Sequence, residues 1–183
     1  MLGDSPAAGQ TGFTSTMTLG ASNTIVADLW TVGGRKSKGL VDMVDGGVLN
    51  LGTDTARGEL RLGYNNLNTG STAVGTFDVS NGTANVYASD IVLGHKSGGG
   101  SGSATGTYIV GDGMTDVAGS IHENGSQNGT SQVLVQGGHG FTVGGIIDID
   151  SFVVGRKDTS TGPNVVATAD FSGNAAVTMI VGD

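Results

Sequence analysis

The chain has 183 residues, a length typical of one domain, and 35 of them are glycine, far above the usual share of about 7%. Only two prolines occur, which excludes collagen, and 13% charged against 37% hydrophobic residues argues against a disordered acidic tail. The net charge of −8 disfavours nucleic acid and anionic membranes as partners, and the lack of cysteine excludes disulfides and thiolate metal sites.

The first eleven residues contain neither the basic stretch nor the apolar stretch of a signal peptide, and we expect residues 1–11 to form a tail. No later run approaches the ~18 apolar residues that a membrane span requires. The sequence stops within a recurring pattern at residues 180–183. We therefore expect one domain over residues 1–183 that is an excerpt of a longer exported chain, with a whole cytoplasmic protein as the alternative.

A short apolar segment closed by glycine recurs along the chain. Its copies are residues 29–33, 59–63, 90–94, 151–155 and 178–182. The intervals between the closing glycines are 30 (from 33 to 63), 31 (from 63 to 94), 61 (from 94 to 155) and 27 (from 155 to 182), and the interval of 61 holds two periods. Interpolation puts the missing copy at residues 121–125. We call this segment the first strand, and its closing glycine the first corner.

A second glycine-closed segment follows each first strand. Its copies are residues 40–47, 75–82, 106–113, 132–138 and 167–174. The intervals from this second corner to the next first corner are 16, 12, 12, 17 and 8, counted from 47, 82, 113, 138 and 174. A third strand lies between each second corner and the next first corner. Because side chains two positions apart share a face of a strand, alternation predicts the inward residues. They are Trp30, Val32, Leu60, Leu62, Ile91, Leu93, Phe152, Val154, Met179 and Val181 in the first strand, Val44, Val79, Val110, Val135 and Phe171 in the second, and Leu49, Leu51, Ala84, Val86, Thr115 and Val117 in the third.

A unit of about thirty residues with three short strands cannot bury its inner face alone, whereas stacked copies can. The sequence therefore predicts an all-β protein, a right-handed parallel β-helix (β-solenoid) of about five coils from residue 12 to residue 183. A β-sandwich or jelly roll is the alternative. Residues 64–74, 95–105 and 156–164 are polar, glycine-rich loops after the first corner, where variation and contacts are expected.

Three stretches carry a resemblance to a known family: residues 75–86 (Gly-Thr-Phe-Asp-Val-Ser-Asn-Gly-Thr-Ala-Asn-Val), 90–95 (Asp-Ile-Val-Leu-Gly-His) and 106–113 (Gly-Thr-Tyr-Ile-Val-Gly-Asp-Gly). They resemble the repeats of exported bacterial proteins with autotransporter-associated β-strand repeats, also found in proteins with sorting signals of the PEP-CTERM type. The likeness is good over residues 59–118, partial over 29–58 and 151–182, and poor over 119–150. It implies a passenger-like β-helix, secreted or at the cell surface, and it brings no catalytic residues.

Basic residues gather just after the first corners. On a solenoid, this corner would form a stripe that could hold an acidic polysaccharide, with residues Arg35, Lys36, Tyr64, Asn65, His95, Lys96, Arg156 and Lys157 as candidates for ligand binding. Lys38 and residues 126–127 lie in the same region. The alternative is that exposed basic residues only solubilise the corner or pair with local carboxylates.

Other chemistry has weaker support. A uronate lyase would need a base beside a carboxylate cluster that holds Ca²⁺. Its pieces would come from Asp112, Asp116, Asp148 and Asp150, which lack the spacing of a calcium loop. His122 beside Glu123, and His139, lack partner spacing for zinc. Thr14, Thr16 and Thr18 alternate as in ice-binding solenoids, but the feature does not recur in every coil. We expect no metal and no cofactor.

The sequence thus predicts a structural or adhesive segment of a bacterial exported protein, secreted or at the cell surface, without catalysis. Its expected partners are acidic polysaccharide or neighbouring copies stacked end to end. A polysaccharide-binding module, or a lyase-like enzyme that uses the basic corner, is the alternative.

Overall fold

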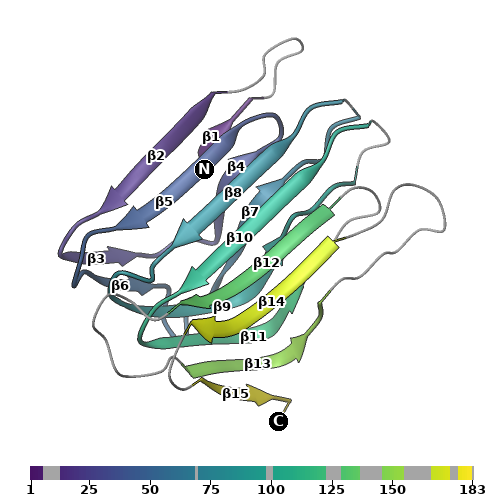
Figure 1. The fold of residues 1–183 in the computed structure, drawn as a ribbon. Helices are drawn as coiled ribbons and strands as arrows, with labels where there is room; N and C mark the ends of the chain where they lie inside the picture. The colour runs from purple at the N-terminus through teal and green to yellow at the C-terminus, as the bar shows by residue number, and fades with distance from the viewer. Residues whose placement is uncertain are drawn as a thin grey trace.

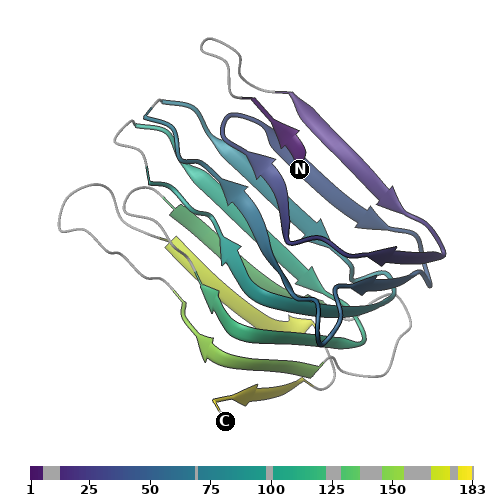
Figure 2. The same cartoon turned by 180° about the vertical axis from the view of Figure 1, so that it is seen from behind.

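The computed structural model describes residues 1–5, 13–68, 70–97, 101–122, 129–136, 146–154, 166–173 and 177–182, with side chains omitted at 129–136 and 172–173. Parallel strands build two sheets that face each other across the core (Figures 1 and 2). One sheet, here called sheet B, stacks β2 (Thr14–Leu19), β5 (Lys38–Met43), β8 (Ala73–Asp78), β10 (Ala104–Val110), β12 (Gly129–Gln136) and β14 (Val166–Gly173).

The other sheet, sheet A, bends around the core. It stacks β1 (Leu2–Asp4), β4 (Leu29–Gly34), β7 (Gly58–Tyr64), β9 (Thr83–Leu93), β11 (Met114–His122), β13 (Ile146–Phe152) and β15 (Thr178–Val181). In the same sheet, β3 (Ser22–Ile25) pairs with β6 (Val48–Leu51), and β6 pairs with the first part of β9. The chain passes from sheet B into sheet A and back in each coil. The predicted parallel β-solenoid is confirmed, with a period of about 31 residues and about 4 turns, close to the five coils expected.

The three predicted strands of a coil are separate in some coils and joined in others. The first two coils have three strands, β2–β3–β4 and β5–β6–β7. In the next two coils, the third and first strands merge into one long strand, β9 or β11, which continues through the bend between them. The difference arises at residues 52–57, which separate β6 from β7, whereas residues 88–90 continue directly within β9.

Inter-strand register shows where the period is constant. Along the first-strand column Trp30 lies opposite Leu60, then Ile91, Ile121 and Phe152, so the sequence position advances by 30, 31, 30 and 31. The interpolated copy at residue 121 is therefore in register. In sheet B, Met17 lies opposite Val41, then Phe77, Tyr108 and Val133, and the position advances by 24, 36, 31 and 25. Loop lengths thus vary while the first-strand column keeps the period.

One apolar core runs along the axis of the stack. Trp30 packs edge-on against Phe77, with ring centroids 5.4 Å apart, and Phe77 packs against Tyr108 at 5.5 Å. The Tyr108 hydroxyl is fully buried and lies 2.8 Å from the Thr115 hydroxyl. The predicted inward residues of β4, β7 and β9 (Trp30, Val32, Leu60, Leu62, Ile91 and Leu93) are all buried, as are Val79 and Val110 of the second-strand segments.

Three details of the predicted core are wrong. Val44 is 39% exposed because β5 ends at Met43 and the chain turns, so Val41 and Met43 are the buried residues of this strand. Val154 is 47% exposed beyond the end of β13. Met179 lies opposite Ile147, and Val181 opposite Ile149, so β15 is a third strand and not the predicted first strand. The Val135 side chain lies outside the described residues.

Glycines allow the two sheets to touch backbone to backbone at the first corner. Gly33, Gly63 and Gly94 have φ of 72°, 67° and 65°, which favours glycine. A Cβ on Gly63 would lie 2.0 Å from the Thr105 carbonyl oxygen, and one on Gly75 of β8 would lie 2.1 Å from the Val32 carbonyl oxygen. These contacts interlock sheet A with sheet B.

Candidate functional site

The first corner brings the predicted basic residues into one backbone ladder. The Arg35 amide donates to the Tyr64 carbonyl at 2.7 Å, and the Asn65 amide donates to the His95 carbonyl at 2.8 Å. Asn65 also forms a parallel bridge with Lys96. Three successive coils therefore contribute Arg35, Asn65 and Lys96 to one stack, as the repeat predicts. Arg156 and Lys157 lie outside the described residues, as do residues 126–127.

Asn65 and Lys96 of this stack, and Lys36 beside it, are buried and support the corner itself. The Lys96 side chain is fully buried, its Nζ donates to the Leu67 carbonyl at 2.8 Å, and burial lowers its pKa. Asn65 is also fully buried, and its amide donates to the carbonyls of Ser71 and Ser103 at 2.7 and 3.2 Å. Lys36 is 4% exposed. Asn65 and Lys96 contact the loops that follow the corner, and all three side chains are buried, so they do not form an exposed cationic stripe.

Next to them, Arg61, Tyr64 and His95 form a stacked cluster in which Arg61 and Tyr64 are partly exposed and His95 is buried. The Arg61 guanidinium lies 4.4 Å from the centroid of the Tyr64 ring, and that ring also stacks on His95 at 4.3 Å and 8°. Arg61 donates from Nε and Nη2 to the Glu59 carboxylate, both at 2.7 Å. His95 is 8% exposed, and its Nδ1 has no hydrogen-bond partner among the described residues. Burial, with the nearby charge of Arg61, lowers the His95 pKa to about 4, so the imidazole is neutral at pH 7.

A pocket of about 130 Å³ opens beside this cluster. Its wall consists of Met1, Asp4, Thr31, Gly34, Arg35, Arg61, Tyr64 and Asn66. Arg35 forms an ion pair with Asp4, with Nε 2.6 Å from the carboxylate. Arg35 and Arg61 each use Nε and Nη2 for a carboxylate, and their Nη1 atoms make no hydrogen bond to the described residues. The wall thus combines two guanidinium groups, a carboxylate, a hydroxyl, an amide and a phenol.

Comparisons with protein-family models, curated proteins and solved structures find no match. The pocket is therefore interpreted from its own chemistry. Among the described residues, no helix has the length and apolar character of a membrane span. The same part of the chain holds no group of three or more histidine, aspartate or glutamate side chains placed to bind a metal ion.

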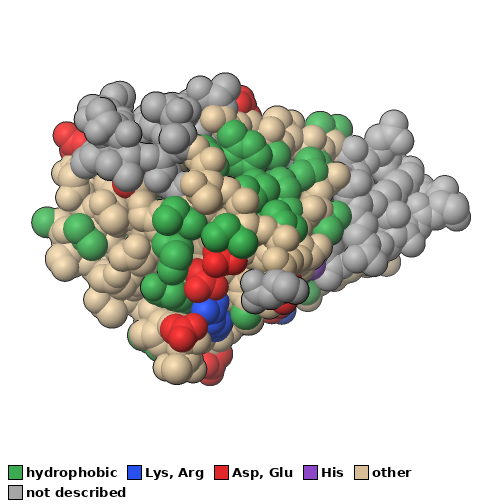
Figure 3. Space-filling model, turned by 90° about the horizontal axis from the view of Figure 1, so that it is seen from below, with side chains coloured by type: hydrophobic (Ala, Val, Ile, Leu, Met, Phe, Trp, Pro, Cys, Tyr) green, Lys and Arg blue, Asp and Glu red, His purple; other side chains and the backbone are tan. Residues whose placement is uncertain are grey.

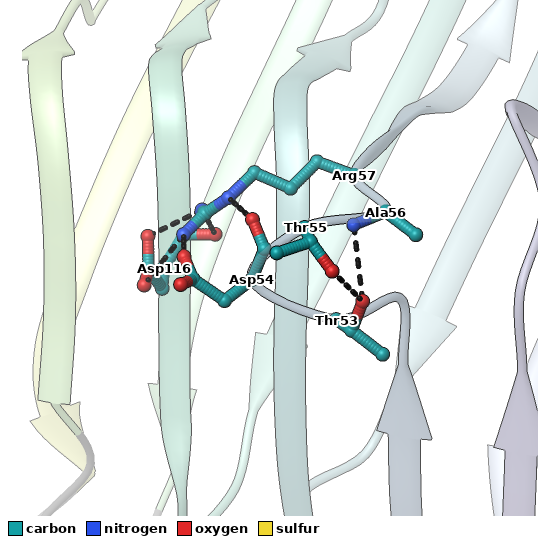
Figure 4. Close-up of polar contacts among 6 residues, drawn as sticks. All are labelled: Thr53, Asp54, Thr55, Ala56, Arg57 and Asp116. Atoms are coloured by element: carbon teal, nitrogen blue, oxygen red, sulfur yellow. Dashed lines mark hydrogen bonds and ion pairs between the residues drawn. The ribbon is translucent and has the colours of Figure 1, made fainter.

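The aspartates considered for lyase chemistry have other surroundings. The Arg57 guanidinium lies 5.6 Å from the centroid of the Tyr87 ring. It donates to both carboxylate oxygens of Asp116, at 2.5 and 3.0 Å (Figure 4). Asp54 accepts a further bond from Arg57 at 2.6 Å. Arg57 thereby links residues that are two coils apart, which is a structural role.

Asp112 is 8% exposed, and burial raises its pKa. Asp148 and Asp150 lie on one side of β13, where Asp150 is exposed. His122 Nε2 lies 4.0 Å from Asp90, whose carboxylate also accepts a bond from the Ser120 amide at 3.1 Å. Glu123 and His139 lie outside the described residues. Thr14, Thr16 and Thr18 lie on one side of β2, but Lys38, Leu40 and Asp42 lie opposite them in the next strand, which interrupts a threonine ladder.

Sequence reasoning missed Asp4, Thr31, Arg61 and Asn66 as members of the site. A signal was present for Arg61, since residues two apart share a face of a strand, and Glu59 and Arg61 therefore predict a surface pair. Asp4 carried no such signal, because it reaches the corner only through the pairing of β1 with β4.

Proposed function

We propose that the chain is a structural or adhesive segment of a bacterial protein, secreted or at the cell surface, in which the solenoid acts as a stiff spacer. The proposal is supported above all by the interlocked corner, where two sheets touch through backbone atoms in successive coils. Such contacts leave little room for the sheets to slide. The described parts of the connections after β7 (residues 65–68 and 70–72) and after β9 (residues 94–97 and 101–103) lie at the same edge and supply surfaces for contacts (Figure 1). We assign the chain no catalytic step.

Stiffness is testable in solution. Small-angle X-ray scattering should fit one rigid shape, and hydrogen exchange should be slowest in β5, β8 and β10, in the middle of sheet B. Scattering that requires an ensemble of flexible shapes would contradict a spacer role. Location is tested separately with an antibody against the chain, which should label intact cells of the producing organism. Labelling only after permeabilisation would contradict a surface location.

A second function, saccharide binding, is favoured by the corner pocket. We infer that the ligand is a single sugar unit of a larger glycan, bound through its hydroxyl groups. Asp4 and Glu59 already pair with the two guanidinium groups, so the pocket offers directional donors and an acceptor with little net charge. That balance, together with the overall charge of −8, favours an uncharged sugar over the acidic one expected from the sequence.

Binding can be measured by nuclear magnetic resonance with methyl glycosides of glucose, galactose and mannose, and with glucuronate. We expect amide shifts at Thr31, Arg61 and Asn66 with a neutral glycoside at millimolar concentration. Asn66→Ala should weaken binding several-fold. Asn68→Ala is the matched control, because Asn68 lies in the same loop but not in the pocket wall. If only glucuronate caused shifts, the ligand would be an acidic sugar and the inference of a neutral one would be wrong. No shift with any probe would refute saccharide binding.

A further inference from the structure

The two ends of the stack carry complementary parts of one coil. At one end, β14 and β15 supply a second and a third strand, and the Ser151–Phe152 part of β13 has a pairing partner only in β11 among the described residues. At the other end, β1 is a first strand that pairs with β4 and precedes β2 in the chain. Among the described residues, one end thus presents a second and a third strand, and the other presents β1, β2 and β3.

At both ends, some backbone groups of the outermost described strands point away from the stack. In a parallel sheet, each strand uses alternate residues toward each neighbour. Toward β5, β2 uses its odd-numbered residues, since the carbonyls of Phe13 and Leu19 accept from Lys38 and Val44. The N–H and C=O groups of Thr16 therefore point away from the stack. The same reasoning applies to Thr24 in β3, because the carbonyls of Ala21 and Ile25 accept from β6 and the loop that follows it.

At the opposite end, the Gly182 amide donates to the Ile149 carbonyl, so even-numbered residues of β15 pair with β13. The backbone groups of Val181 are therefore directed outward. Following the alternation through β8, β10 and β12 gives the same result for Ala169 in β14.

The β2–β3 edge lacks the features that usually prevent edge pairing. Natural edge strands carry charges or proline, whereas β2 (TSTMTL) and β3 (SNTI) contain neither. At the other end, Ile180 and Val181 are exposed by 43% and 51%, and apolar side chains gather on the face seen from below (Figure 3). Partly buried Phe152, Phe171 and Met179 complete the core there and lack a covering coil among the described residues.

We propose that a second copy of this chain occupies the β14–β15 end, with its β2 beside β14 and its β3 beside β15. The columns of the core would then continue, with Met17 of the second copy following Ala169 and Ile25 following Met179. The contact joins unlike ends, so it does not close on itself and extends into a filament. This inference is independent of saccharide binding at the corner.

Two variants separate this contact from general stickiness. The head variant combines Thr16→Pro with Thr24→Pro, and the tail variant combines Ala169→Pro with Val181→Pro. Each proline removes an N–H that points outward, so the stack itself should be retained while one edge is blocked. Thr16→Ser with Thr24→Ser is the control for the head, because it keeps both N–H groups.

The readout is mass by light scattering and particle length by electron microscopy, from micromolar to millimolar concentration. The unmodified chain and the serine control should form rods that lengthen with concentration. Each proline variant alone should be a monomer, and an equimolar mixture should give dimers and nothing larger, which also shows that both variants fold. A monomeric unmodified chain, dimers of a single variant, or a mixture that remains monomeric would each overturn the proposal.

Discussion

The interlocked glycines at the first corner give the sharpest prediction for stability. Gly75→Ala should destabilise the fold severely, although the backbone of Gly75 has no positive φ. Its Cβ would lie 2.1 Å from the Val32 carbonyl oxygen and 2.2 Å from the Gly63 nitrogen. Both atoms belong to sheet A, which cannot move away from Gly75 without breaking hydrogen bonds between its own strands. Overpacking in a rigid interior costs ~1–3 kcal/mol, and backbone atoms that cannot yield place this case at or above ~3 kcal/mol.

Three further alanine variants separate steric overlap from backbone strain. Gly46 has φ of 69° and nothing within 4 Å of its Cβ position, so Gly46→Ala should cost only the ~1–2 kcal/mol of a left-handed conformation. Gly20 has neither constraint, so Gly20→Ala should change stability by less than ~1 kcal/mol. Gly63 has both, with φ of 67° and its Cβ 2.0 Å from the Thr105 oxygen, and Gly63→Ala should be the worst of the four.

Urea unfolding followed by circular dichroism measures the series. We expect the order Gly20, Gly46, Gly75 and Gly63, from mildest to most severe. Exposed substitutions that disturb nothing change stability by no more than ~0.5 kcal/mol. If Gly75→Ala differed from Gly20→Ala by no more than that margin, the interlocked corner would be refuted, because the sheets would then be free to separate.

Three other predictions each test the surroundings of one side chain. His95 should make the fold less stable as pH falls from about 6.5 to about 4, because its pKa of about 4 means that the folded state binds fewer protons than the unfolded state. The loss of stability by pH 4 is ~3 kcal/mol, and His95→Phe should remove this part of the pH dependence of urea unfolding. An unchanged pH dependence would contradict the burial of the imidazole. Arg57→Ala should lower stability by ~1–2 kcal/mol in the same assay, because it removes the bidentate bond to Asp116. Asp54→Ala should lower it hardly at all, because the Asp54 carboxylate is 80% exposed. Equal losses would rule out a link between coils. Tyr108→Phe should lower stability by ~1–2 kcal/mol, because it leaves the buried Thr115 hydroxyl without its hydrogen-bond partner. Adding Thr115→Val should recover part of that loss. No recovery would show that the two hydroxyls are not partners.

The period could be predicted from the sequence because parallel pairing requires each coil to return its first strand to the same place. Trp30, Leu60 and Ile91 reveal this return through their spacing alone. The position of β15 was predicted wrongly, because residues 178–182 copy the apolar segment and glycine of a first strand. The interval of 8 from 174 to 182, against 12 to 17 elsewhere, was the available signal. A third strand begins directly after the second corner, as β9 begins at Thr83 just after the corner at Gly82. A short interval between the second corner and the next closing glycine therefore indicates a third strand.

The candidate site was less predictable, since it depends on how far each loop folds back over its corner. Lys96 and Arg61 both appear in sequence as basic residues at a corner, yet the first is fully buried and the second lies at the surface. Lys96 is covered because the Leu67 carbonyl of the preceding coil reaches its Nζ, and no local pattern encodes that contact. The repeat therefore identifies which residues stack on one another, and the loops decide which of them meet solvent. A ligand at this corner would accordingly be recognised by side chains from the strand ends, Arg61 and Tyr64, together with Asn66 from the loop.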